Sequence, residues 1–186
     1  MRHIVALALP AAVLLLGCAD DPIGNATPDQ AARMDPDAPA GAMPTTASAY
    51  LAAAASSDQY EIQSSQMVEG SDAPAPVRDF ARMMIQHHQK TTQTLTGAAR
   101  AAGITPPPPS LQPKHAQMLA QLRAQQGDAL HSAYLTQQMQ AHQEALTLHR
   151  GYAEGGDTPE LQKAATAAVP IIEQHLERLR RIGNNP

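Results

Sequence analysis

The feature that most restricts the fold of this chain is a pair of histidines inside an apolar helical stripe. Residues 77–90 read V-R-D-F-A-R-M-M-I-Q-H-H-Q-K, which has the periodicity of a helix with one buried face. That face consists of Val77, Ala81, Met84, His88, Thr91 and Leu95. Because the stripe has to pack against other helices, His88 is predicted to be buried, with His87 beside it. Three later segments also place a histidine in an apolar stripe, so the sequence predicts an all-helical bundle with polar groups in its interior.

Composition favours helices over sheets. Only 3% of the 186 residues are aromatic and tryptophan is absent, whereas a β-sandwich or barrel needs β-branched and aromatic side chains. The length predicts one domain. The formal net charge of −4 at pH 7 provides no basic stripe to replace phosphate counterions, which argues against nucleic acid as a partner.

The N-terminus has the pattern of an exported lipoprotein. Residues 1–17 combine a short basic start with an apolar run too brief for a mature transmembrane helix, which is typical of a signal peptide. The run ends in L-L-G-C, which resembles the bacterial lipobox; the alternative is an ordinary signal peptide with a chance cysteine. Acylated Cys18 is expected to hold the chain to the lipid bilayer. Ala19, in place of aspartate, favours the outer membrane, with the folded domain facing the periplasm. Since Cys18 is the only cysteine, structural disulfides are excluded.

A linker and five helices are expected after the signal peptide. Residues 18–47 are rich in proline, alanine and aspartate without an apolar period, so we expect a linker before a folded domain at 48–183. Ser110 and Asp128 are the expected N-caps of the third and fourth helices, and Pro170 predicts a kink in the last. The predicted helices span about 46–70, 74–102, 110–126, 128–154 and 158–182, with the prolines at 106–109 extended.

Four long helices and one short helix fit few architectures. The long, partly helical connection between the second and fourth helices lets the chain cross the length of a bundle, which is the one-crossover topology of ferritin-like four-helix bundles. Counting about 1.5 Å per residue along each helix places His88 and His142 at nearly the same height. The same count places Glu61 and His175 one to two turns above them.

Several motifs resemble the bacterial family called domain of unknown function 4142. They are S-D-Q-Y-E-I, V-R-D-F-A-R-M-M-I-Q-H-H-Q-K-T, G-D-A-L-H-S-A-Y-L-T-Q-Q-M-Q-A-H and A-A-V-P-I-I-E-Q-H-L, spread between Thr46 and Ile182. The resemblance implies a ferritin-like four-helix bundle, often exported, with no settled activity. Members usually carry an acidic residue where this chain has His87, so a role for a carboxylate there does not carry over. The family pattern matches Glu61, His88, Tyr134, Met139, His142, Pro170 and His175.

The histidines and methionines suggest a metal site. The run M-M-I-Q-H-H-Q is similar to the Met…His-His signature of small periplasmic helical proteins linked to copper handling. Imidazole binds zinc, copper or iron, and a thioether suits Cu(I). Met84 and His88 lie four residues apart, as do Met83 and His87, so each pair can present its donors together. The chain contains no Glu-x-x-His, which argues against a di-iron carboxylate centre.

A purely structural interpretation of the same residues also stands. His88, His142 and His175 can be core histidines satisfied by one another and by Glu61, Tyr134 or buried water, in a network that fixes helix register. The methionines can be gap-fillers in an alanine-rich core. We expect the remaining histidines of the helices to be peripheral and the basic cluster to complement a helix dipole. These residues are His115, His131 and His149, and Arg178, Arg180 and Arg181.

Two functions therefore remain open, and both are without a catalytic residue. No nucleophile elbow, phosphate-binding loop, dinucleotide fingerprint or free cysteine nucleophile is present in the sequence. The favoured function is a non-catalytic, membrane-tethered module that acts in the envelope through an unidentified protein partner or in a stress response. The alternative is a periplasmic protein that binds a transition metal, copper first. Its candidate residues are Glu61, His87, His88, His142 and His175, supported by Met84, Tyr134 and Met139.

Overall fold

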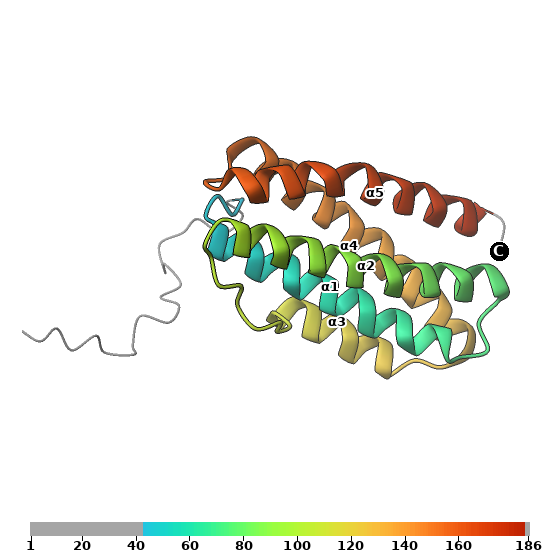
Figure 1. Ribbon diagram of the computed structural model, residues 1–186. Helices are drawn as coiled ribbons and strands as arrows, with labels where there is room; N and C mark the ends of the chain where they lie inside the picture. Colours follow the sequence, from blue (N-terminus) through green and yellow to red (C-terminus); the bar gives the residue numbers. More distant parts are fainter. Residues whose placement is uncertain (1–42, 185–186) are drawn as a thin grey trace, which may run out of the picture. The chain divides into compact units, whose positions relative to one another are not determined.

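The computed structural model describes residues 43–184, so the predicted signal peptide, Cys18 and most of the predicted linker lie outside the described residues. Within that range every regular element is helical (Figure 1). The helices are α1 Ala47–Glu69, α2 Ala75–Ala101, α3 Pro113–Arg123, α4 Gly127–Gly155 and α5 Pro159–Asn184. None of these helices contains an apolar stretch sufficient for a transmembrane span.

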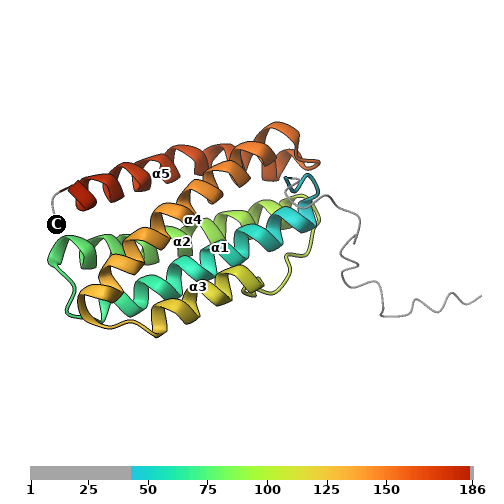
Figure 2. The same cartoon turned by 180° about the vertical axis from the view of Figure 1, so that it is seen from behind.

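The four long helices form a closed ring with α3 outside it. Helix α1 packs against α2 and α4, and α5 packs against the same two helices (Figures 1 and 2). The chain leaves α2 through the extended segment 105–112, and α3 then runs along α1 and α4. Helices α1 and α4 are antiparallel, because Tyr50 near the start of α1 stacks on Tyr152 near the end of α4. The predicted all-helical, four-helix bundle with a short crossover helix is confirmed.

Local signals explain most helix ends. Thr46 caps α1 by accepting a hydrogen bond from the Ala49 N–H at 3.4 Å. Helix α3 begins three residues after the predicted N-cap, because Ser110 still belongs to the extended proline-rich segment and Gln112, with ψ 157°, is the capping residue. Asp128 lies in the first turn of α4 rather than at its cap, where its charge still complements the helix dipole. Helix α5 continues through Pro170.

The few aromatic residues are the largest fully buried side chains of the core. All four tyrosines and the single phenylalanine of the chain are fully buried, and each of these rings removes a large apolar area from water. They lie in two apolar clusters, one around Phe80 and Tyr134 and the other around Tyr50 and Tyr152. The polar groups of the interior lie close to the middle of the long helices: Asp58 is the central residue of α1 and His88 is the central residue of α2.

Candidate metal site in the bundle interior

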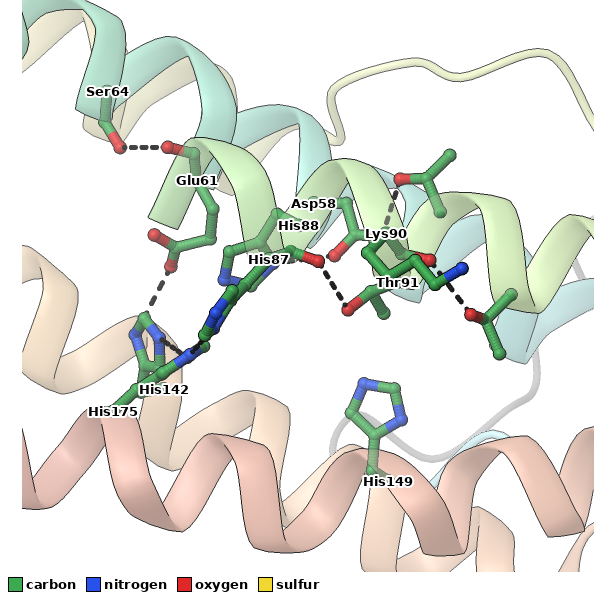
Figure 3. A network of polar contacts seen from close by, with 12 residues as sticks. Asp58, Glu61, Ser64, His87, His88, Lys90, Thr91, His142, His149 and His175 are labelled. Carbon is green, nitrogen blue, oxygen red and sulfur yellow. Dashed lines mark hydrogen bonds and ion pairs between the residues drawn. The ribbon is translucent and has the colours of Figure 1, made fainter. Parts of the chain in front are cut away.

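Three histidines from three helices meet at the middle of the bundle. His88 of α2, His142 of α4 and His175 of α5 are 7%, 1% and 2% exposed. One ring nitrogen from each lies within 4.8 Å of those of the other two, and we call this group the central cluster (Figure 3). The shortest of these approaches is 3.1 Å, between His142 Nε2 and His175 Nδ1. Their helical stripes direct all three rings inward.

The outward nitrogen of His88 is held by a carboxylate. His88 Nδ1 donates to Asp58 Oδ1 at 2.8 Å, and the other oxygen of Asp58 accepts the Thr92 hydroxyl at 2.7 Å. This contact fixes the ring orientation and leaves Nε2 as the nitrogen that can bind a ligand once it is deprotonated. Carboxylate–histidine pairs of this kind orient the ligands of many metal sites.

The rings of His142 and His175 form an ordered hydrogen-bond chain. His142 Nδ1 lies 2.9 Å from the Gln138 carbonyl oxygen, which can only accept, so this nitrogen carries the proton and Nε2 carries the lone pair. His175 Nδ1 then donates to His142 Nε2 at 3.1 Å. His175 Nε2 in turn accepts from His87 Nδ1 at 2.7 Å. Each ring of the central cluster thus has one nitrogen fixed by a neighbour outside the cluster.

Two buried nitrogens have no hydrogen-bond partner within residues 43–184, His88 Nε2 and His131 Nδ1. Of these two residues, only His88 belongs to the central cluster. An unsatisfied buried polar atom costs about 1–3 kcal/mol and calls for an explanation. The aligned lone pair of an imidazole at this position has the chemistry of a metal ligand.

Burial keeps most of the cluster uncharged. Burial, helped by the charge of His88, lowers the pKa of His142 to about 3. Burial, helped by the neighbouring imidazoles His142, His88 and His87, lowers the pKa of His175 to about 2. Both rings are therefore neutral at pH 7, which is the form that binds metals. Burial also lowers the pKa of His88, but the hydrogen bond and charge of Asp58, together with the charge of Glu61, outweigh it and raise that pKa.

Glu61 approaches the cluster from α1. Its Oε1 lies 3.6 Å from His142 Nδ1, and its Oε2 has no hydrogen-bond partner among the described residues. Burial raises the pKa of this carboxyl group to about 7, although the charge of His88 and a hydrogen bond from Gln138 lower it. Glu61 and His175, which the residue count placed one to two turns above His142, have side-chain atoms 3.6 Å and 3.1 Å from its ring nitrogens. The count assumed straight helices with level ends, and the actual loops and helix inclinations change these offsets.

The supporting residues named from the sequence lie in the apolar core beside the cluster. Met84 and Tyr134 belong to the core cluster around Phe80, and half-buried Met139 packs at its margin. The Tyr134 hydroxyl is hydrogen-bonded to Ser65 Oγ at 2.9 Å. The Phe80 ring lies 6.4 Å from the His142 ring. The apolar core around Phe80 therefore adjoins the His142 side of the central cluster.

Two of the histidines predicted to be peripheral are buried. His149 is 5% exposed and its Nδ1 is hydrogen-bonded to the Tyr50 hydroxyl at 2.9 Å. His131 is 6% exposed and lies 3.3 Å from Ser71 Oγ. Only His115 is half-buried, with its Nδ1 accepting from Ser56 Oγ at 2.6 Å. In each of these three imidazoles a neighbouring hydroxyl bonds one ring nitrogen, while Nδ1 of His131 has no partner among the described residues.

Sequence reasoning missed two residues that position the cluster. Asp58 and Gln138 are 4% and 0% exposed, and they supply the acceptors for His88 and His142. The signal for Asp58 was present, because a carboxylate lies on the same predicted helix face as Leu51 and Ala54. Gln138 contributes through its main-chain carbonyl, for which side-chain chemistry gives no signal.

Comparison with known proteins identifies a family without assigning an activity. A sequence model of the family described as "Domain of unknown function (DUF4142)" matches residues 32–182. The matched region includes the whole central cluster and begins inside the segment predicted to be a linker. No curated protein and no solved structure matches the chain.

Proposed function

Because the chain belongs to the DUF4142 family, whose description assigns no activity, we propose a function from the interior geometry: the protein binds one transition-metal ion at the central cluster. The ligand atoms are His88 Nε2, His142 Nε2 and His175 Nδ1. The observation that carries this proposal is the convergence of three buried ring nitrogens. In each ring the other nitrogen is already held by Asp58, the Gln138 carbonyl or His87.

The donor set narrows the class of metal. Three imidazoles without a thiolate suit zinc, copper, iron or nickel and not the oxygen-seeking calcium or magnesium. Two nitrogens bound to one tetrahedral ion lie roughly 3.4 Å apart, since each bond is about 2.0–2.1 Å long. The 3.1 Å approach of His142 to His175 is close to this value. Binding requires His175 to move its proton from Nδ1 to Nε2 and His87 to move its own proton from Nδ1 to Nε2, so that His175 Nε2 then donates to His87 Nδ1 and their hydrogen bond is reversed.

The competing account is a network of core histidines without a metal. The bonds between His142, His175 and His87 support it, because they are complete within the protein. His88 Nε2 favours the metal account, because this unpaired buried nitrogen belongs to a ring grouped with two further imidazoles, whereas His131, whose Nδ1 is also unpaired, belongs to no such group within residues 43–184.

Metal loading of the detergent-solubilised full-length protein tests the proposal. After removal of metals with a chelator, the protein is offered Zn(II), Cu(I), Cu(II), Co(II) and Fe(II), and bound metal and melting temperature are measured. We expect one ion per chain for at least one metal. At a free concentration 100 times the Kd, stabilisation is about 2.7 kcal/mol, which raises the melting temperature by about 5–10 °C. His88→Ala should abolish both effects, and stoichiometric binding unaffected by this variant overturns the assignment.

We also propose that the bundle is tethered to the outer membrane through acylated Cys18 and faces the periplasm. The L-L-G-C sequence and the absence of any other cysteine support this proposal. Mass spectrometry of the N-terminal peptide from bacterial membranes should show a chain that begins at Cys18 and carries acyl groups. Cys18→Ser should move the protein to the soluble periplasmic fraction.

A further inference from the structure

One hollow on the surface of the bundle reaches the central cluster from outside. It has a volume of about 230 Å³, lies between α2 and α5, and is lined by Met83, His87, Gln174, His175, Arg178 and the ion pair of Glu177 with Arg181. We call it the portal. His175, a proposed metal ligand, forms part of its lining, so the portal reaches one residue of the metal site.

His87 separates the portal from the interior. Its ring is half-buried, its centroid lies 5.0 Å from that of His175, and the two rings are inclined by 25° (Figure 3). His87 also lines a second hollow of about 360 Å³ on the same face, whose lining is mostly apolar and includes Ala168 and Ile171. Because open space lies on two sides of the His87 ring, the side chain can rotate without displacing the core.

The opposite side of the cluster is closed by bonded groups. A third hollow, of about 570 Å³ beneath the proline-rich segment, is lined by Asp58, Thr92 and Thr96. Asp58 is only 4% exposed, and its two oxygens are held by His88 and Thr92. An ion on this route has to break the contact that orients His88, whereas an ion at the portal has only to pass one half-buried ring.

We propose that the portal is the route by which the metal ion reaches and leaves the central cluster, and that His87 is its gate. This inference rests on the proposed metal-binding function. Rotation of His87 breaks its 2.7 Å hydrogen bond to His175 Nε2 and opens a path from solvent to that ligand. The only carboxylate in the lining, Glu177, is paired with Arg181. The portal therefore offers hard cations no free carboxylate and offers imidazole and thioether donors to a borderline or soft ion.

Rates of loading and release test the gate. Zn(II) and Cu(I), each supplied from a chromogenic chelator, are followed by stopped-flow with the full-length protein in detergent. His87→Phe fills the portal, and we expect loading and release both to slow at least tenfold, although the lost hydrogen bond to His175 Nε2 also weakens the affinity. His87→Leu, a smaller plug, should act in the same direction and serves if the Phe variant does not fold. His87→Ala should accelerate both rates.

If His87 only positions His175 and does not act as a gate, a different result is expected. All three variants then accelerate release and leave loading unchanged, and this result overturns the gate. Thr96→Phe narrows the hollow beneath the proline-rich segment and is the matched control, with both rates expected to equal those of the wild type. Slower rates in this control, with unchanged rates in His87→Phe, place the route on the other side. A wild-type protein that binds neither ion contradicts the metal site itself.

Discussion

Two buried histidine clusters in the same bundle differ in how their nitrogens are satisfied. In the central cluster the rings of His142 and His175 face each other and His88 Nε2 has no partner among the described residues. The end cluster, which we define as Tyr50, His149, Tyr152 and Asp157, uses hydroxyls. His149 bonds the Tyr50 hydroxyl at 2.9 Å, the Tyr152 hydroxyl donates to Asp157 at 2.9 Å, and the two tyrosine rings stack at 3.9 Å.

The comparison shows that burial of a histidine does not by itself indicate a ligand. Burial lowers the pKa of His149 to about 4 and that of His142 to about 3, so both rings are neutral at pH 7. The two clusters differ in the group that each ring nitrogen contacts. A hydroxyl closes the end cluster, whereas in the central cluster His142 Nε2 and His175 Nδ1 bond each other and His88 Nε2 stays unpaired, so a shared cation would give the third ring a partner as well.

The largest expected effect comes from replacing one histidine of each cluster by an apolar residue of similar size. His142→Leu removes one of only three coordinate bonds and should weaken metal binding at least about 1000-fold, roughly 4 kcal/mol. His149→Leu should leave the affinity unchanged, because His149 lies seven residues, about 10 Å, further along α4. Competition with a chelator of known affinity measures both. Equal affinities of the two variants remove the distinction between the clusters.

The second effect is acid destabilisation of the metal-free protein through His149. The folded-state pKa of about 4 lies below the unfolded value of about 6.5, so the unfolded chain binds more protons between these values and stability falls as the pH falls. From pH 7.5 to pH 4 this group should cost the wild type about 3 kcal/mol. Urea unfolding at pH 7.5 and at pH 4 gives the free energies of unfolding of the wild type and of His149→Gln. The change with pH in the difference between the two proteins is the cost due to His149. Parallel pH profiles contradict it.

The third effect is a difference in metal affinity between variants of two carboxylates, Asp58 and Asp157. Asp58→Asn replaces the charged acceptor that orients His88 and should weaken metal binding about 10–100-fold, as expected for a partner of a ligand. Asp157→Asn is the matched variant, because Asp157 accepts from the Ala47 N–H and the Tyr152 hydroxyl and touches no proposed ligand. It should lower the free energy of unfolding by about 1 kcal/mol and leave metal affinity unchanged. Isothermal titration with the same metal measures both affinities.

The sequence predicted the bundle well because its signals are local. The apolar stripe through Val77 and His88 repeats every three to four residues, and Thr46 is the N-cap of α1. Signals of this kind allow helices and their buried faces to be assigned without tertiary information. The inward direction of His142 and His175 follows from the same periodicity. Helix α3 began later than expected, because the extended conformation set by residues 106–109 continues past Ser110.

The contacts between helices could not be predicted in the same way. Whether Glu61 lies beside His142 or two turns above it depends on loop geometry and helix inclination, which no short stretch encodes. The burial of His149 depends on Tyr50, 99 residues away in the chain. The pairing of His88 with Asp58 required the register of α1 against α2, although the carboxylate on an apolar stripe was visible from the start.

The smallest effect tests whether the end cluster is purely structural. Tyr50→Phe keeps the stacked ring but removes the hydroxyl, so His149 Nδ1 loses its partner in a fully packed site. The free energy of unfolding should fall by about 1–2 kcal/mol, because the cost is that of one unsatisfied buried nitrogen. Metal affinity should not change, since the variant leaves the positions of His88, His142 and His175 untouched. If a metal ion instead binds the Tyr50→Phe protein at a second site, the hydroxyl was the only barrier to a ligand role for His149, and the two clusters differ by a single oxygen atom.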